Sequence, residues 1–170
     1  MFRDVNVPSN GELVESIRHT PSLSAEEVKA ILEARGDVVV LDARRFEEYR
    51  TTSIPRGVSV PGAELALRIH DIAPSPDTLV IVNCAGRTRS IIGARSLVNA
   101  GMPNRVAALR NGTIGWTLAG FGLEKGRAER FGETGRDVAR ARARRWAATP
   151  TSRIRLWKPR FYDFSRRVGI

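Results

Sequence analysis

Cysteine, histidine and long apolar runs are scarce in this chain of 170 residues. The one cysteine, Cys84, cannot form an intramolecular disulfide and is compatible with the reducing cytoplasm. The two histidines lack the spacing of a metal site, so we expect no metal and no cofactor. No run approaches the ~20 apolar residues that span a membrane, and the start of the chain lacks the apolar core of a secretory signal. These features predict a cytoplasmic protein.

Positive charge exceeds negative charge by ten, but the excess is confined to one end of the chain. Residues 1–126 hold 15 Lys/Arg and 14 Asp/Glu, whereas residues 127–170 hold 13 Lys/Arg and 4 Asp/Glu. The part that contains Cys84 is therefore nearly neutral, and its affinity for anions must come from the local placement of arginines. We divide the chain into a leader or linker over 1–21, a domain over 22–126 and a basic, aromatic-containing C-terminal extension over 127–170.

Apolar runs rich in β-branched residues alternate with helical patterns in the domain, which predicts an α/β fold with a parallel sheet and helices on both faces. The expected strands are Val38–Leu41, Val58–Val60, Leu79–Asn83 and Val106–Leu109. The expected helices begin near residues 22–24, 45, 63, 90 and 114, the first with a capping box formed by Ser24 and Glu27. Ligands bind at the carboxyl ends of such strands. We therefore expect residues 42–44, Cys84 and residues 110–112 to meet at one crevice.

Cys84 opens the segment CAGRTRS (residues 84–90), which connects an apolar strand to a helix. A thiolate there would be favoured by the backbone N–H groups of residues 85–90, by the helix N-terminus and by the charges of Arg87 and Arg89. Gly86 permits the positive φ that a tight loop would need. The alternative is that Cys84 is a small buried apolar residue. The polar composition of the loop favours the nucleophile.

The segment resembles the active-site loop of the rhodanese-like sulfurtransferases, and other landmarks follow in the order of that family. They are Asp42-Ala43-Arg44, Glu48-Tyr49, Ile54–Val58, Val60-Pro61-Gly62 and Leu109–Gly112 with Trp116. The match covers about residues 22–125 and is most similar to one repeat of bacterial proteins with several rhodanese domains in tandem. It implies the rhodanese-like three-layer fold, with a central parallel sheet of about five strands. Departures include Ser53 in place of the usual histidine and Asn111-Gly112 in place of paired glycines.

The resemblance implies a thiosulfate sulfurtransferase-type enzyme with Cys84 as its catalytic nucleophile. Cys84 would take a sulfane sulfur from a small anion such as thiosulfate, and cyanide or a thiol would accept it from the Cys84 persulfide. Arg87 and Arg89 would bind the oxyanion end of the donor. The substrate-binding residues of the loop are completed by Ala85, Gly86, Thr88 and Ser90, the last two through hydroxyl groups that donate to the persulfide.

Asp42 and Arg44 have two interpretations as supporting residues. Arg44 could lie at the rim of the pocket, or Asp42 could accept hydrogen bonds from backbone N–H groups and Arg44 and so hold the end of the strand. We favour the second, structural interpretation.

Two other functions stay open at this point. The domain could be a non-catalytic rhodanese module that relays sulfur or binds a protein within a larger assembly, although the intact cysteine and both arginines favour an enzyme. The related phosphatases carry arginine six positions after the cysteine, where this chain has Ser90, so phosphate chemistry ranks third.

The basic extension mixes aromatic side chains with arginines, which allows contact with nucleic acid or a partner protein. A packed accessory segment is the simpler interpretation of that extension.

Overall fold

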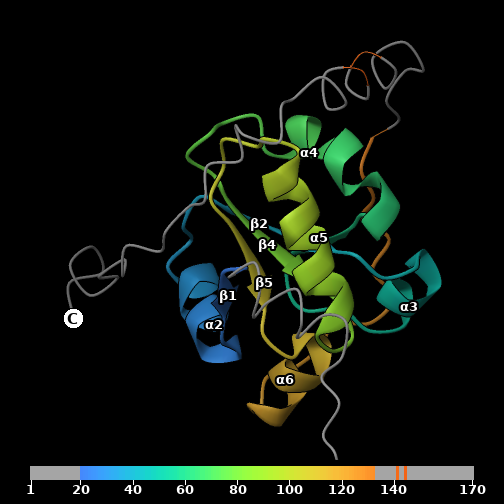
Figure 1. The fold of residues 1–170 in the computed structure, drawn as a ribbon. Coiled ribbons are helices and arrows are strands. Elements are labelled where there is room, and N and C mark those ends of the chain that lie inside the picture. The colour runs from blue at the N-terminus through green and yellow to red at the C-terminus, as the bar shows by residue number, and fades with distance from the viewer. Residues whose placement is uncertain (1–19, 133–140, 142–143, 145–170) are drawn as a thin grey trace, which may run out of the picture.

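The computed structural model describes residues 20–132 together with residues 141 and 144 (Figure 1). Its sheet has five strands in the order β1-β5-β4-β2-β3, and every strand pair is parallel. The strands are β1 (Ser22–Leu23), β2 (Val38–Asp42), β3 (Gly57–Ser59), β4 (Leu79–Asn83) and β5 (Val106–Leu109). The helices are α2 (Ala25–Glu33), α3 (Phe46–Thr51), α4 (Leu65–Ile72), α5 (Thr88–Asn99) and α6 (Gly112–Leu118), with a 3-10 turn at Gly62–Glu64. The predicted three-layer α/β fold is confirmed.

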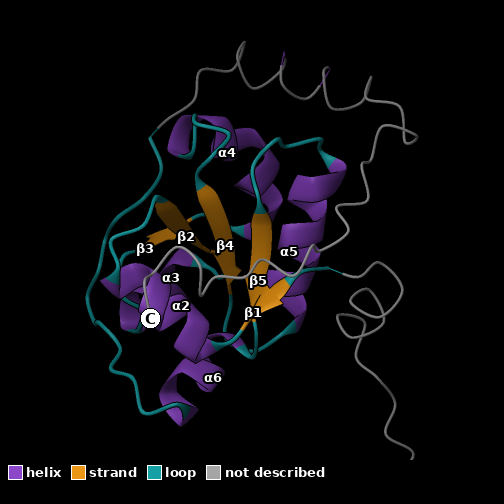
Figure 2. Cartoon of the chain, turned by 90° about the vertical axis from the view of Figure 1, so that its left-hand side faces the viewer, coloured by secondary structure: helices purple, strands orange, loops and turns teal. Residues whose placement is uncertain are grey.

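Helices cover both faces of the sheet (Figures 1 and 2). On one face, α2 and α6 pack their apolar side chains against alternate residues of the strands, with Trp116 fully buried among them. On the other face, α4 and α5 pack against the intervening strand residues. Because both faces are covered, the central strands are apolar at almost every position. This is why the bounds predicted for β4 and β5 are confirmed.

The start of the domain differs from the prediction. The helix begins at Ala25 with Ser24 as its N-cap, but Ser22 and Leu23, expected at the helix start, instead form a parallel edge strand with β5. Pro21 O accepts from the N–H of Ala108 at 2.8 Å, and Leu23 O accepts from that of Arg110 at 2.8 Å. Two residues carry too little pattern to indicate a strand, and only pairing with a distant segment forms it.

The capping box at the start of α2 is confirmed. The N–H of Glu27 donates to Ser24 Oγ at 3.2 Å, and the N–H of Ser24 donates to Glu27 Oε2 at 2.7 Å. Further along the chain, Leu65 and Ile69 of α4 are fully buried. They lie in the layer between the sheet and α5, where no solvent reaches them.

The chain beyond α6 returns along the outer edge of the sheet. Ser53 and Glu124 exchange two backbone hydrogen bonds of 2.8 Å, and the N–H of Ser59 donates to Glu129 O at 3.0 Å. The first residues of the predicted C-terminal extension therefore lie against β3 and shield its open edge. Most of that extension and the leader lie outside the described residues. Among the residues described, no helix is long and apolar enough to cross a membrane.

Candidate active site

Cys84 follows β4 directly at the carboxyl edge of the sheet and is 2% exposed, with a free thiol. β2 and β4 run in register, so Asp42 lies beside Asn83 at the same edge. From β5, the turn at residues 110–112 leads into α6, whose first residues contact the Cys84 loop. The expected meeting of the three segments at one edge of the sheet is confirmed.

The first turn of α6 holds the backbone of the Cys84 loop. Cys84 O accepts from the N–H and from the hydroxyl of Thr113, both at 2.9 Å, and Ala85 O accepts from the N–H of Ile114 at 3.0 Å. In a trans peptide the N–H of the next residue points away from the carbonyl. The N–H groups of Ala85 and Gly86 are therefore directed away from α6. The loop can offer both donors to an anion on its other side.

Gly112 allows this close approach. A Cβ atom there would lie 2.2 Å from Cys84 O and 2.5 Å from Gly86 O, and its φ is +52°. Asn111 before it also has a positive φ, of 58°. The expectation that Gly86 would need a positive φ is wrong, because the left-handed residues lie in the turn that enters α6 instead. A Cβ atom at Gly86 would meet no other atom within 4 Å.

α5 begins at Thr88 and directs its N-terminus at the same loop. The N–H groups of the first turn of a helix have no acceptor within the helix, and the helix dipole adds partial positive charge at this end. Thr88 is half-buried. Ser90 is fully buried, and its hydroxyl donates to Arg87 O at 2.8 Å and approaches Leu109 O at 3.5 Å. Ser90 thus lies inside the first turn of α5, and its hydroxyl points at the backbone of α5 and β5.

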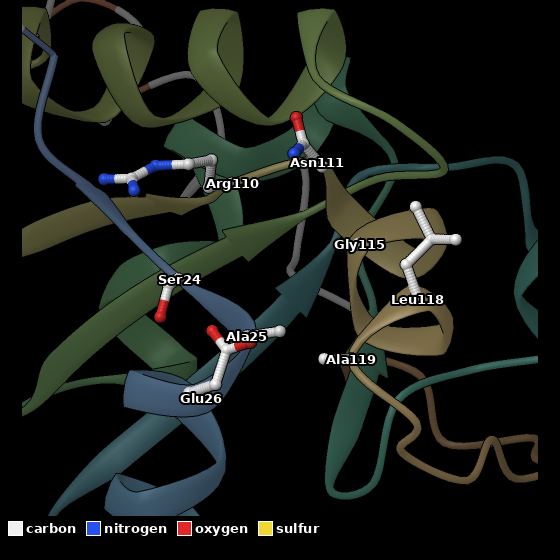
Figure 3. A pocket seen from close by; sticks show the side chains of 8 residues that line it. All are labelled: Ser24, Ala25, Glu26, Arg110, Asn111, Gly115, Leu118 and Ala119. Atoms are coloured by element: carbon white, nitrogen blue, oxygen red, sulfur yellow. The ribbon is translucent and has the colours of Figure 1, made fainter.

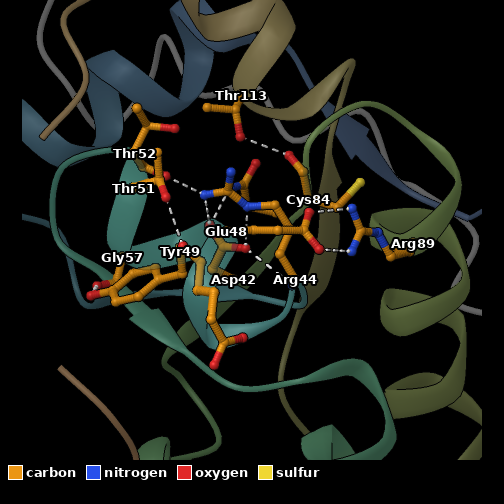
Figure 4. Close-up of polar contacts among 12 residues, drawn as sticks. Asp42, Arg44, Glu48, Tyr49, Thr51, Thr52, Gly57, Cys84, Arg89 and Thr113 are labelled. Atoms are coloured by element: carbon orange, nitrogen blue, oxygen red, sulfur yellow. Dashed lines mark hydrogen bonds and ion pairs between the residues drawn. The ribbon is translucent and has the colours of Figure 1, made fainter. Parts of the chain in front are cut away.

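Arg89 is exposed and forms an ion pair with Glu48 of α3 (Figure 4). Its Nη1 donates to Glu48 Oε1 at 2.9 Å, and its Nη2 donates to Oε2 at 2.8 Å. These bonds hold the pKa of Glu48 at about 2, well below its usual 4.5. The hydrogen bonds that Arg89 donates to Glu48 raise the pKa of Arg89. Burial opposes the rise, and the charges of Glu48, Cys84 and Asp42 add to it. Arg89 therefore interacts electrostatically with Cys84 as well as with a carboxylate.

Asp42 and Arg44 form a buried ion pair at the end of β2 (Figure 4). Arg44 Nε donates to Asp42 Oδ1 at 2.8 Å and Nη2 to Oδ2 at 2.7 Å, while the backbone N–H of Arg44 donates to Oδ1 at 3.1 Å. Asn83 Nδ2 donates to the same carboxylate at 2.9 Å, and Arg44 Nη2 also reaches Thr52 O at 2.5 Å. This is the structural arrangement favoured from the sequence. The network joins the ends of β2 and β4 one residue before Cys84.

The sequence did not indicate the contacts that three residues make in this site. Glu48 belonged to a landmark, but nothing local linked it to Arg89, which lies 41 positions further on. Gly112 and Thr113 were predicted only as a turn and the start of a helix. Their carbonyl and hydroxyl contacts depend on how α6 docks on the loop. The sequence offered one signal for these contacts, which is that the helix start near residue 112 closely follows the end of β5.

A hollow lies between the N-terminus of α2 and α6 (Figure 3). Its volume is about 310 Å³. Its lining residues are Ser24, Ala25, Glu26, Arg110, Asn111, Gly115, Leu118 and Ala119. Within residues 20–132, no three histidine, cysteine or acidic side chains gather in a way that could hold a metal ion.

Comparison with known families decides the classification. The rhodanese-like domain family matches residues 24–119. The chain belongs to this family. The rhodanese-like domain thus comprises the whole sheet except β1, and it contains Cys84, Glu48, Arg89 and the start of α6.

Three relatives place the rhodanese-like domain in different proteins. A solved thiosulfate sulfurtransferase from Pseudomonas aeruginosa is 68% identical with a TM-score of 0.77, over 85% of this chain and 28% of that protein. The HTH-type transcriptional regulator Rv0324 of Mycobacterium tuberculosis is 31% identical, over 54% of this chain and 39% of the regulator. The putative sulfur carrier protein YrkF of Bacillus subtilis is 27% identical, over 61% of this chain and 54% of that protein. The chain therefore spans less than two thirds of each relative. The sulfurtransferase and YrkF support sulfur transfer only in general terms.

Proposed function

We propose that the protein transfers a sulfane sulfur from a donor such as thiosulfate to a thiophilic acceptor through a persulfide on Cys84. The observation that carries the proposal is the orientation of the loop. Two of its carbonyls are bonded to α6, so the N–H groups of Ala85 and Gly86 are available on the side away from α6. Fixed donors of this kind stabilise an anionic sulfur without reorganising when it forms.

In the first step, the Cys84 thiolate attacks the outer sulfur of thiosulfate. A bond forms between Cys84 Sγ and that sulfur, the S–S bond of the donor breaks, and sulfite leaves with the electron pair. Arg87 and Arg89 bind the oxyanion end of the donor, and Thr88 contributes its hydroxyl. The thiolate, not the thiol, is the form of Cys84 that attacks.

In the second step, an acceptor takes the outer sulfur. Cyanide or a thiolate attacks it, the bond to Cys84 Sγ breaks, and the Cys84 thiolate returns with the electron pair. The sequence contains no second cysteine, so no resolving thiol of this chain can compete for the persulfide. The acceptor must come from outside the chain, and a reducing compartment such as the cytoplasm would supply thiols.

A non-catalytic module is the second candidate, because YrkF carries the name of a sulfur carrier rather than of an enzyme. Such a module would accept or hold sulfur without turning it over. The solved relative named a thiosulfate sulfurtransferase favours catalysis, and its 68% identity makes it the closer of the two.

Mass spectrometry after treatment with thiosulfate tests the proposal. We expect the Cys84 peptide to gain one sulfur atom, the gain to be absent in Cys84→Ser, and added cyanide to remove it with formation of thiocyanate. A stable gain that cyanide or thiols never discharge would favour the carrier. No gain with thiosulfate or with a small-molecule persulfide would contradict both candidates.

A further inference from the structure

Arg89 connects the nucleophile to a carboxylate that the sulfur chemistry does not use. Within residues 20–132, both side-chain hydrogen bonds of Arg89 go to Glu48 through its two Nη atoms. A guanidinium carries five N–H donors, so the pairing leaves others that can meet an anion at the mouth of the loop. Figure 4 shows the guanidinium facing Glu48 with the Cys84 side chain beside it.

A donor that binds to Arg89 therefore also meets the negative charge of Glu48. The low pKa of Glu48 keeps this carboxylate ionised at every working pH. Its repulsion grows in proportion to the charge of the donor. Thiosulfate and the sulfite that leaves are dianions, whereas the hydropersulfide of a small thiol is neutral or singly charged. The pair is about half exposed, at 45% for Arg89 and 38% for Glu48, so solvent weakens this effect without removing it.

We propose that Glu48 is a specificity-determining residue that lowers the positive charge of the donor site and favours small-molecule persulfides over dianionic donors such as thiosulfate. The inference rests on the proposed function, since it names the class of donor for the same site. With a persulfide donor, the bond between Cys84 Sγ and the outer sulfur forms, the S–S bond of the donor breaks, and the small thiolate leaves with the electron pair.

The first test compares two donors in matched variants. Glu48→Gln removes the charge but keeps an oxygen that accepts from Arg89. Glu47→Gln makes the same change at the neighbouring, exposed position of α3. We expect Glu48→Gln to raise kcat/KM for thiosulfate by about three- to tenfold, mainly through a lower KM, and to change that for the hydropersulfide of 2-mercaptoethanol by less than about twofold. Glu47→Gln should leave the ratio between donors near that of the wild type, and Glu48→Asp should restore it.

The second test needs no sulfur transfer. Cys84 is alkylated with iodoacetate, an anion, and with iodoacetamide, a neutral reagent of similar size. The rate ratio of iodoacetate to iodoacetamide should rise about three- to tenfold in Glu48→Gln and stay constant in Glu47→Gln. Because each ratio is taken within one variant, a general loss of reactivity cancels.

The outcomes separate this inference from the proposed function. A shifted alkylation ratio without any sulfur loading would leave the charge effect intact and contradict sulfur transfer. Equal changes for both donors would show that Glu48 only positions Arg89 and would overturn the inference, as would ratios that match those of Glu47→Gln. Failure of both reagents to modify wild-type Cys84 would contradict the access that the inference requires.

Discussion

At the scale of single residues, the site depends on where side chains are missing as much as on where they are present. Gly112 lies against the carbonyls of Cys84 and Gly86, and its lack of a Cβ atom lets α6 bond to the loop. The left-handed φ at this position excludes most other residues for a second, independent reason. Gly86 lies inside the loop, but it has neither a close neighbour that would exclude a Cβ atom nor a positive φ.

These two glycines give a paired prediction. Gly112→Ala should lower the free energy of unfolding by about 2–4 kcal/mol, because it adds backbone strain and a clash with two carbonyls. Gly86→Ala should change it by less than about 1 kcal/mol. Urea denaturation of both variants measures the difference. Similar losses in the two proteins would show that the approach of α6 to the loop is not tight.

The sequence pointed to Cys84, but it placed the need for a glycine with positive φ at Gly86 instead of at Gly112. Cys84 was predicted as a nucleophile because its neighbours along the chain are polar and basic rather than apolar. The conformation of its loop is determined by contacts with residues 111–114, and no pattern within residues 84–90 reports them. The same holds for Ser90, whose hydroxyl is occupied by carbonyls that only the folded helix brings within reach.

At the scale of elements, continuous apolar runs made the central strands predictable, whereas pairing alone made β1. Leu79–Asn83 and Val106–Leu109 are buried on both faces, so their whole length is apolar or lies at a strand end. β1 forms only because β5 offers it hydrogen-bonding partners. A strand can be predicted from local sequence when it buries its own apolar residues. It cannot be predicted in this way when, as for β1, hydrogen bonds to a neighbouring strand stabilise it.

The start of α2 gives a prediction at this scale. Ser24→Ala removes the side chain that accepts from the N–H of Glu27 and should cost about 1 kcal/mol of unfolding free energy. Ser96→Ala is the matched control, because Ser96 lies within α5, where its hydroxyl bonds to Ile92 O and alanine is the better helix former. Urea denaturation should therefore separate the two variants. An equal response would show that the cap contributes nothing beyond helix propensity.

At the scale of the whole molecule, carboxylates with low pKa values join segments that lie far apart in the chain. Glu48 links α3 to α5 through Arg89. Glu129, whose pKa is held at about 2 chiefly by its hydrogen bond with Arg127, also contacts Tyr49 of α3. Such pairs involve residues 41 and 80 positions apart, which explains why the sequence did not reveal them. The basic excess of the chain, in contrast, was readable from composition alone.

Acid should weaken the fold in a defined window. The folded pKa of Glu48 lies below its usual value, so its contribution to stability is complete above about pH 4.5 and is lost as the pH falls toward about 2. We expect the urea midpoint of the wild type to fall between pH 5 and pH 3. The stability difference between wild type and Glu48→Gln should be largest above pH 4.5 and should shrink through the same window.

Salt provides the control for that titration. The pair is half exposed, so added sodium chloride should reduce the difference between the two proteins at neutral pH. A difference that does not depend on pH or salt would assign the effect of the substitution to packing rather than to charge.

The hydrogen bonds from Thr113 and Ile114 to the loop also define what would have to be moved in protein engineering. The segment CAGRTRS, transplanted between a strand and a helix of another parallel sheet, would bring the nucleophile and its arginines but leave the carbonyls of Cys84 and Ala85 without their donors. The smallest transferable unit is therefore two chain segments, residues 84–90 and residues 111–114. A scaffold that accepts only the first would inherit the chemistry of an ordinary thiol.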